Sequence, residues 1–150
     1  MQDFVHLHVH TQYSILDGQA SVPKLVDKAI RDGMRGMAVT DHGNMMGIKE
    51  FFNYTNKVTG KAKGIVKDTE AKLETLRDGT YKPKLDKEGK NPDEGKTTDE
   101  LIAECEATLK KQRPIAQFKP IFGCEMYVAR RGDKALKEVR ADQSGWHLIV

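Results

Sequence analysis

The stretch FVHLHVH at residues 4–10 decides the fold, because its side chains alternate strictly between two faces. One face carries Phe4 and three histidines, His6, His8 and His10, and the other face is entirely apolar. A period of two residues is typical of a β-strand. We therefore predict that residues 4–10 form the first strand and that its three histidines project in one direction.

The residues that follow predict two βα units. Ser21 is a suitable N-cap, Pro23 fits the first turn of a helix and Gly33 is a stop signal, so a helix is expected between them. A short strand is expected at residues 36–40 and a second helix from residue 48 to about 57. Strand, turn and helix in this repeated order predict a parallel α/β architecture.

Residues 58–113 differ in composition from the rest of the chain, and we interpret them as a charged insertion. Residues 78–97 have too little apolar surface to offset chain ordering, so a mobile loop is expected there. Thr97 and Glu100 form a capping-box pattern, which predicts a helix over residues 98–112. Acidic residues alternate with the basic ones, which favours a solvated surface over a nucleic-acid-binding arm.

Core-like sequence returns after the insertion, with short strands predicted at residues 120–122 and 125–129. A last strand is predicted at residues 146–150, where the sequence ends in mid-run. Because a domain rarely stops on an open strand, we expect residues 1–150 to be the N-terminal part of a larger domain.

The composition excludes several classes of protein. The net charge is +3, from 25 Lys and Arg against 22 Asp and Glu, which gives no bulk signal for nucleic-acid binding. Cys105 and Cys124 are the two cysteines, too few for a secreted disulfide framework, and we expect both to be buried. Signal-peptide and membrane-spanning patterns are not found, so a cytoplasmic protein without membrane association is expected.

Histidines at the predicted strand ends indicate a metal site. Two residues apart on a strand, His8 and His10 have Cα atoms roughly 7 Å apart and can bind one metal ion or two neighbouring ones. Ligands gather at the carboxyl ends of parallel strands, where His10 ends the first strand and Asp41-His42 follows the second. These two groups are expected to converge.

Asp17, Glu125 and His147 complete the candidate set. Each has a plain alternative when taken singly: a turn residue, a surface carboxylate and a packed, hydrogen-bonded histidine. Their joint placement at strand ends favours a metal site instead. A mixed His and carboxylate set favours zinc, manganese or iron and a catalytic rather than a structural role.

Four segments resemble the motifs of the PHP (polymerase and histidinol phosphatase) domains that open the alpha subunits of bacterial DNA polymerase III. Residues 4–18 resemble the first motif, residues 38–44 the second and residues 119–125 the third, and residues 147–150 resemble the start of the fourth. Together these segments are spread along the chain on both sides of the insertion.

The resemblance implies part of a distorted (β/α)7 TIM-like barrel, the PHP fold, with a multinuclear cluster of divalent metal ions. His6 is not expected to bind metal, and Asp41 is expected to orient a neighbour; catalytic residues beyond the ligands are not assigned. The implied metal ligands are His8, His10, Asp17, His42, Glu125 and His147.

The resemblance also implies a function. It predicts a metal-dependent phosphoesterase site of the 3′ to 5′ exonuclease type inside a DNA-directed DNA polymerase, a nucleotidyltransferase of DNA replication. The implied partners are DNA, the remaining polymerase domains and other replicase subunits. Asp17 followed by Gly18 favours the polymerase branch over stand-alone histidinol phosphatases.

Two alternatives stay open: a metal-poor structural scaffold of the polymerase, and a stand-alone PHP phosphatase. The family's remaining ligands would lie beyond Val150. We therefore expect weak metal binding and no robust nuclease activity from these 150 residues alone.

Overall fold

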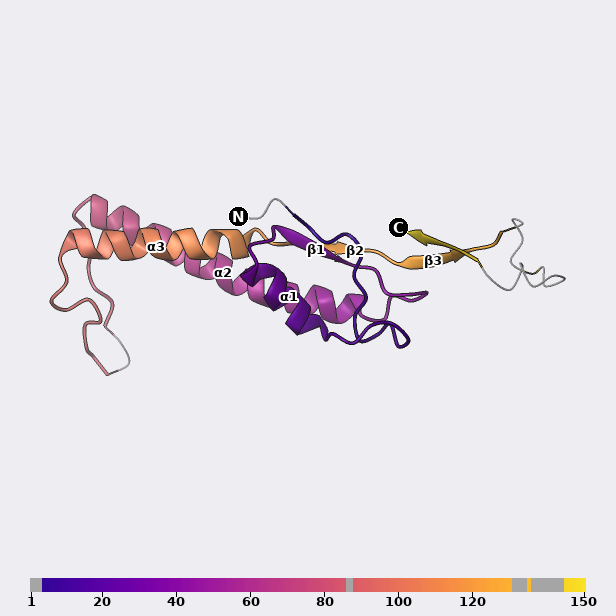
Figure 1. Ribbon diagram of the computed structural model, residues 1–150. Helices are drawn as coiled ribbons and strands as arrows, with labels where there is room; N and C mark the ends of the chain where they lie inside the picture. Colours follow the sequence, from indigo (N-terminus) through magenta and orange to yellow (C-terminus); the bar gives the residue numbers. More distant parts are fainter. Residues whose placement is uncertain (1–3, 86–87, 131–134, 136–144) are drawn as a thin grey trace. The chain divides into compact units, whose positions relative to one another are not determined.

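The computed structural model describes residues 4–85, 88–130, 135 and 145–150. The chain divides into two compact units: unit 1 comprises Met1–Lys57 and Phe118–Val150, and unit 2 comprises Val58–Gln117 (Figure 1). The elements in chain order are α1 (Val22–Arg31), β1 (Gly36–Val39), α2 (Ile48–Arg77), α3 (Thr98–Ala116), β2 (Lys119–Phe122), β3 (Glu125–Val128) and β4 (Trp146–Ile149).

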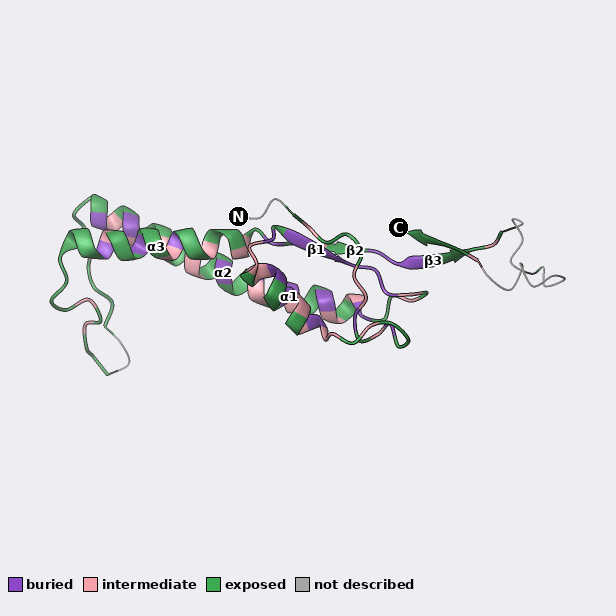
Figure 2. Ribbon diagram, viewed as in Figure 1, coloured by how far each residue is buried: buried purple, intermediate pink, exposed green. Residues whose placement is uncertain are grey.

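The core of unit 1 lies between α1, β1 and the start of α2. Val22, Val26 and Ala29 are spaced three or four residues apart, so they share one face of α1, and all three are buried. They join the same core cluster as Val39 of β1 and Phe51 of α2. The strand β1 is buried along its whole length, as Figure 2 shows.

Two small sheets position the loops of unit 1. β1 and β2 pair in parallel, in a register that runs from Gly36 opposite Lys119 to Val39 opposite Phe122. β3 and β4 pair antiparallel, and an isolated parallel bridge joins His42 to Glu125. This mixed helix and strand architecture agrees with the predicted α/β class.

Residues 4–10 do not form the strand that the alternation predicted. They are extended beside β1, where the Ala38 amide donates to the His6 carbonyl (2.8 Å) and the Thr40 amide donates to the Val9 carbonyl (2.9 Å). Three residue steps along this segment, from His6 to Val9, lie opposite two steps from Ala38 in β1 to Thr40, the residue after it. The segment therefore carries one extra residue, as a β-bulge does. The Val9 amide then donates to the Thr40 hydroxyl (3.0 Å), which interrupts the ladder.

The second helix does not end near residue 57 as predicted, because α2 continues to Arg77. The charged residues of this stretch include many good helix formers, and the glycines at 60 and 64 do not end the helix. Leu73 and Leu76, one helical turn apart, also give the C-terminal part of α2 an apolar face that is buried.

Unit 2 is a helical hairpin with its own core. Leu73 and Leu76 of α2 cluster with Leu101, Cys105 and Leu109 of α3. The two helix segments are antiparallel, since Arg113 pairs with Glu70 (2.8 Å) and Arg77 pairs with Glu106 (2.9 Å).

The first turn of α3 has a complete capping box. The Thr97 hydroxyl accepts from the Glu100 amide (3.3 Å), and the Thr97 amide donates to the Glu100 carboxylate (2.8 Å). The helix extends to Ala116, past the expected end near residue 112. Pro114 lies inside its last turn.

Cys105 and Cys124 are both buried and unpaired, as expected. Of the helices in the described part of the chain, none combines the length and apolar character that a membrane crossing requires.

Candidate metal centre

The segment that carries His8 and His10 is fixed against the end of β1 by two side chains. The Thr40 hydroxyl bonds His8 Nδ1 (2.9 Å), and the carboxylate of Asp41 accepts from the Thr11 amide (2.6 Å) and the Thr11 hydroxyl (2.9 Å). Asp41 is fully buried. Asp41 therefore holds Thr11, the residue after His10, and it belongs to neither group of possible metal ligands among the described residues.

The loop that carries Asp17 is tied to the turn after β1 by Ser14. This buried serine donates its hydroxyl hydrogen to Asp17 Oδ1 and accepts from the His42 amide (3.1 Å). The loop closes tightly, since a Cβ at Gly18 would lie 1.9 Å from the Thr11 carbonyl oxygen. A glycine is thus required after Asp17.

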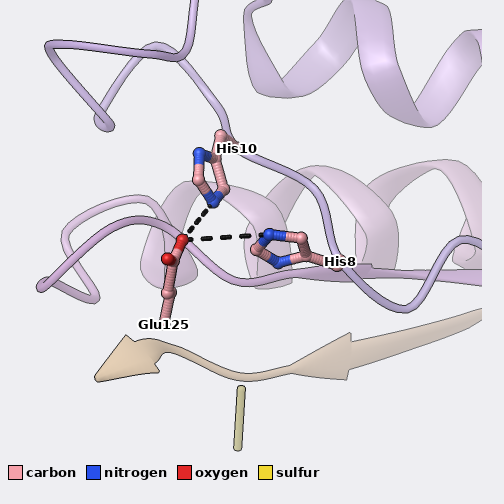
Figure 3. A group of neighbouring side chains, drawn as sticks. All are labelled: His8, His10 and Glu125. Carbon is pink, nitrogen blue, oxygen red and sulfur yellow. Dashed lines mark ion pairs between the residues drawn. The ribbon is translucent and has the colours of Figure 1, made fainter. Parts of the chain in front are cut away.

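Glu125 lies at the centre of the site. Its Oε2 atom is 2.7 Å from His10 Nε2 and 3.8 Å from His8 Nε2 (Figure 3). The same oxygen is 3.5 Å from His42 Nδ1, and Oε1 is 2.6 Å from His147 Nδ1. One carboxylate, 9% exposed, therefore faces four imidazoles.

Asp17 forms a second bridge between imidazoles. Its Oδ1 atom lies 3.0 Å from His10 Nδ1 and its Oδ2 atom lies 3.2 Å from His42 Nδ1. Two carboxylates therefore connect histidines that come from separate segments of unit 1. We call these six residues the His/carboxylate cluster: His8, His10, Asp17, His42, Glu125 and His147.

Two buried atoms at the centre of the cluster lack hydrogen bonds. His10 Nε2 and Glu125 Oε2 are 2.7 Å apart, yet neither makes an aligned hydrogen bond within the described structure. Buried polar atoms are normally satisfied, so such a pair calls for an explanation. Two ligand atoms about 2.1 Å from one ion lie roughly 3 Å apart at a right angle and roughly 3.4 Å apart at the tetrahedral angle, so a small outward movement of this pair would let both atoms bind one cation.

The cluster contains two groups of possible ligands. His8, His10 and Glu125 form one, and His42, Glu125 and His147 form the other, with the ligand atoms of each group within 4.8 Å of one another. Glu125 belongs to both. A carboxylate shared in this way could contribute to binding a metal ion in either group.

The electrostatics keep both carboxylates ionised. Burial alone would raise the pKa of Glu125, but the hydrogen bond from His147 and the nearby His42 and His10 lower it overall. The pKa of Asp17 is lowered mainly by the hydrogen bond from Ser14, with further contributions from His10 and His42. Both carboxylates thus carry negative charge at neutral pH.

The alternation of side chains along β3 and the register between β3 and β4 determine which side chains face the cluster. Glu125 and Tyr127 are two residues apart on β3 and share a face, and His147 on β4 lies directly opposite Tyr127. The Tyr127 hydroxyl is hydrogen-bonded to His42 Nε2, and the tyrosine ring packs edge-on against His147 at 4.9 Å. Tyr127 is therefore a neighbour of the cluster that the sequence analysis did not identify.

The structure brings all six candidate residues together in unit 1. His6 belongs to neither ligand group, and its ring packs against Phe4 at 4.8 Å. Besides Tyr127, sequence reasoning missed Ser14 and Thr40, whose roles depend on contacts between distant segments. For Tyr127 a signal was present, namely its two-residue spacing from Glu125.

Comparisons with known proteins agree with this geometry. The PHP domain family matches residues 6–150. The DNA polymerase III subunit alpha of Mycobacterium tuberculosis is 50% identical over 54 residues, which are 36% of this chain and 5% of that protein. The DNA polymerase III subunit alpha of Saccharopolyspora erythraea is 54% identical over 54 residues, 36% of this chain and 4% of its own length.

A third relative, the DNA polymerase III subunit alpha of Aquifex aeolicus, is 47% identical over 51 residues, 34% of this chain and 4% of that protein. Each match thus spans 5% or less of the relative. The family match extends over nearly the whole chain, and the chain belongs to the PHP domain family.

Proposed function

We propose that the His/carboxylate cluster is a metal-dependent phosphoesterase site of the 3′ to 5′ exonuclease type, in the PHP domain of a DNA polymerase III alpha subunit. The observation that carries this proposal is the buried pair His10 Nε2 and Glu125 Oε2, which face each other without hydrogen bonds. A cation bound by both atoms would supply the interaction that each lacks.

In this proposal the two ligand groups hold neighbouring ions. His8 and His10 hold one ion and His42 and His147 hold the other, with Glu125 common to both. Asp17 lies between His10 and His42 and can complete either coordination shell. Imidazoles combined with carboxylates suit zinc, manganese or iron better than calcium.

When bound, such ions lower the pKa of a coordinated water and neutralise charge on a phosphate group. The protein's own residues keep the ligands in place for that chemistry. Thr40 holds the His8 ring through Nδ1, so its Nε2 faces Glu125. Ser14 fixes both the Asp17 carboxylate and the backbone of His42, so the ligand atoms need little rearrangement.

The wider context follows from the similar proteins. We infer that the chain forms part of a TIM-like barrel and acts in a replicase that synthesises DNA, with DNA, further polymerase domains and other replicase subunits as partners. Polymerisation itself would be carried out elsewhere in such a protein. The matched relatives support this context, since all three are DNA polymerase III alpha subunits.

The proposal is tested by titrating the chain with Mn²⁺ or Zn²⁺ and then with thymidine 5′-monophosphate, the type of product that a 3′ to 5′ exonuclease releases. Calorimetry should detect metal binding by the wild-type chain and by His6→Ala, a matched control from the same segment. His8→Ala/His10→Ala should lose it. The metal-loaded chain should bind the monophosphate, and thymidine at the same concentration should not bind.

Two results would contradict the proposal. The proposed metal site would be contradicted if the wild-type chain did not bind metal. It would also be contradicted if the wild-type chain and His8→Ala/His10→Ala bound metal equally well. Metal binding without discrimination between the monophosphate and thymidine would instead indicate a structural role for the ions.

A further inference from the structure

We propose that Tyr127 is a positioning residue for His42 and that its hydroxyl hydrogen binds a phosphate oxygen of the substrate. This inference rests on the proposed phosphoesterase function and assigns a role in that site to a residue outside the His/carboxylate cluster.

Tyr127 lies on the same strand as Glu125 and contacts the two histidines of the second ligand group. It lies two residues after Glu125 on β3 and directly opposite His147 on β4. Its hydroxyl is hydrogen-bonded to His42 Nε2, and its ring centroid lies 5.0 Å from that of His42. The tyrosine therefore contacts both histidines of this group, and Glu125, two residues before it on β3, supplies the carboxylate.

The hydrogen bond determines which nitrogen of His42 faces the site. His42 Nδ1 lies 3.2 Å from Asp17 Oδ2 and 3.5 Å from Glu125 Oε2. A nitrogen that binds metal must offer a lone pair, so a neutral His42 that binds through Nδ1 carries its proton on Nε2. That Nε2–H then donates to the Tyr127 oxygen, as outer partners of metal-bound histidines commonly accept.

This assignment leaves the hydrogen of the tyrosine hydroxyl available. The hydroxyl oxygen then accepts from His42, and among the described residues the hydroxyl hydrogen has no acceptor. Tyr127 is 59% exposed although it borders a mostly buried carboxylate. Its hydroxyl can thus donate to a group that arrives from solvent at the second ligand group, and for a phosphoester that group is a phosphate oxygen.

The test compares Tyr127→Phe with Tyr54→Phe, which removes the same atom from a tyrosine whose hydroxyl is bonded to Asp27 (2.9 Å) instead of the cluster. Calorimetric titration with Zn²⁺ should show about 10- to 100-fold weaker binding for Tyr127→Phe and no change for Tyr54→Phe. At saturating Zn²⁺, inorganic phosphate should bind about tenfold more weakly to Tyr127→Phe than to the wild-type chain.

A spectroscopic measurement separates positioning from general damage. In the Zn²⁺-loaded wild-type chain, ¹⁵N NMR of the imidazoles should show a protonated His42 Nε2 and a metal-bound Nδ1, whereas in Tyr127→Phe the two nitrogens should compete for the ion and the signals should broaden. Unchanged Zn²⁺ affinity, phosphate affinity and His42 spectrum in Tyr127→Phe would overturn the inference while leaving the phosphoesterase proposal intact. If the wild-type chain did not bind Zn²⁺, both the inference about Tyr127 and the phosphoesterase proposal would be overturned.

Discussion

Two carboxylates of similar burial, one in each unit, differ in whether their oxygens are hydrogen-bonded. In unit 2, Asp93 is 10% exposed and receives hydrogen bonds from Lys72 (2.7 Å) and from the Tyr81 hydroxyl. In unit 1, Glu125 is similarly buried, yet one of its oxygens has no hydrogen bond and faces an imidazole nitrogen that has none either. The first carboxylate is satisfied by its own fold, and the second is not.

This contrast separates a stabilising ion pair from a binding site. A satisfied buried carboxylate contributes to stability, whereas an unsatisfied one costs free energy unless a ligand supplies the missing interaction. The same chain therefore offers a control for each test of the cluster, since the described residues of unit 2 include charged and apolar side chains of comparable burial and form no group of possible metal ligands.

The largest expected effect on stability is in the core of unit 2. Leu101 is 5% exposed, and Leu101→Ala should lower the free energy of unfolding by about 3 kcal/mol because it removes buried methyl groups and leaves a cavity. Urea unfolding followed by circular dichroism measures this change. Leu85→Ala, at a side chain that is 62% exposed, should change it by less than about 0.5 kcal/mol.

The same Leu101→Ala variant sharpens the comparison between the units. If the cluster depends on unit 1 alone, Zn²⁺ affinity should match that of the wild-type chain under conditions where the variant is folded. A lower Zn²⁺ affinity in the folded Leu101→Ala variant would instead show that the packing of unit 2 supports the site. That result would contradict the independence of the two units.

A smaller effect is expected from the pH dependence of unit 2. The hydrogen bond from Lys72, followed by that from Tyr81, lowers the pKa of Asp93 below its ordinary value. A carboxyl group whose pKa is lower in the folded than in the unfolded state stabilises the fold above the unfolded pKa, about 4, and loses this contribution as pH falls through the folded pKa. Asp93→Asn should therefore remove about 1 kcal/mol at neutral pH and nothing at the lowest pH.

Urea unfolding at a series of pH values from 2 to 7 provides this measurement, roughly spanning the titration of a carboxyl group. The difference in unfolding free energy between the wild-type chain and Asp93→Asn should shrink as pH falls below about 4. A difference that stays constant across this range would mean that the Lys72–Asp93 pair does not depend on the charge of Asp93.

Local sequence signals predicted which helices and strands form better than they predicted where each one ends. The Ser21, Pro23 and Gly33 signals marked α1, and the apolar run after Arg35 marked β1. The alternation of residues 4–10 predicted a strand that is absent, because the Thr40 hydroxyl accepts the amide that a regular ladder would pair with backbone. That competition between a side chain and the backbone involves residues 31 positions apart and leaves no local signal.

The end of α2 was missed for a different reason. The change in composition after Lys57 was interpreted as the start of a charged insertion and the end of the second helix, yet the helix continues and packs against an apolar surface of α3. Leu73 and Leu76 are buried only when Leu101 and Leu109 lie against them. Hairpin packing of this kind is a tertiary effect that a reading of α2 by itself does not include.

The candidate site was predictable to the extent that it follows strand periodicity and the convergence of strand ends. His8, His10, His42 and Glu125 were expected to meet for that reason, and the structure brings them together. The hydrogen bonds of Ser14 and Tyr127 were not expected, because they join segments 28 and 85 positions apart in sequence. Their contributions become visible only once the loops are placed.

The central claim is that Glu125 is shared by two metal ions, and calorimetric titration of Glu125→Gln with Zn²⁺ tests it most directly. Asp93→Asn is the matched control, since it neutralises a carboxylate of similar burial in unit 2. The account predicts that Glu125→Gln weakens binding at both ligand groups by at least about 100-fold, more than loss of an outer partner does, while Asp93→Asn binds as the wild-type chain does. Wild-type stoichiometry and affinity in Glu125→Gln would contradict the claim.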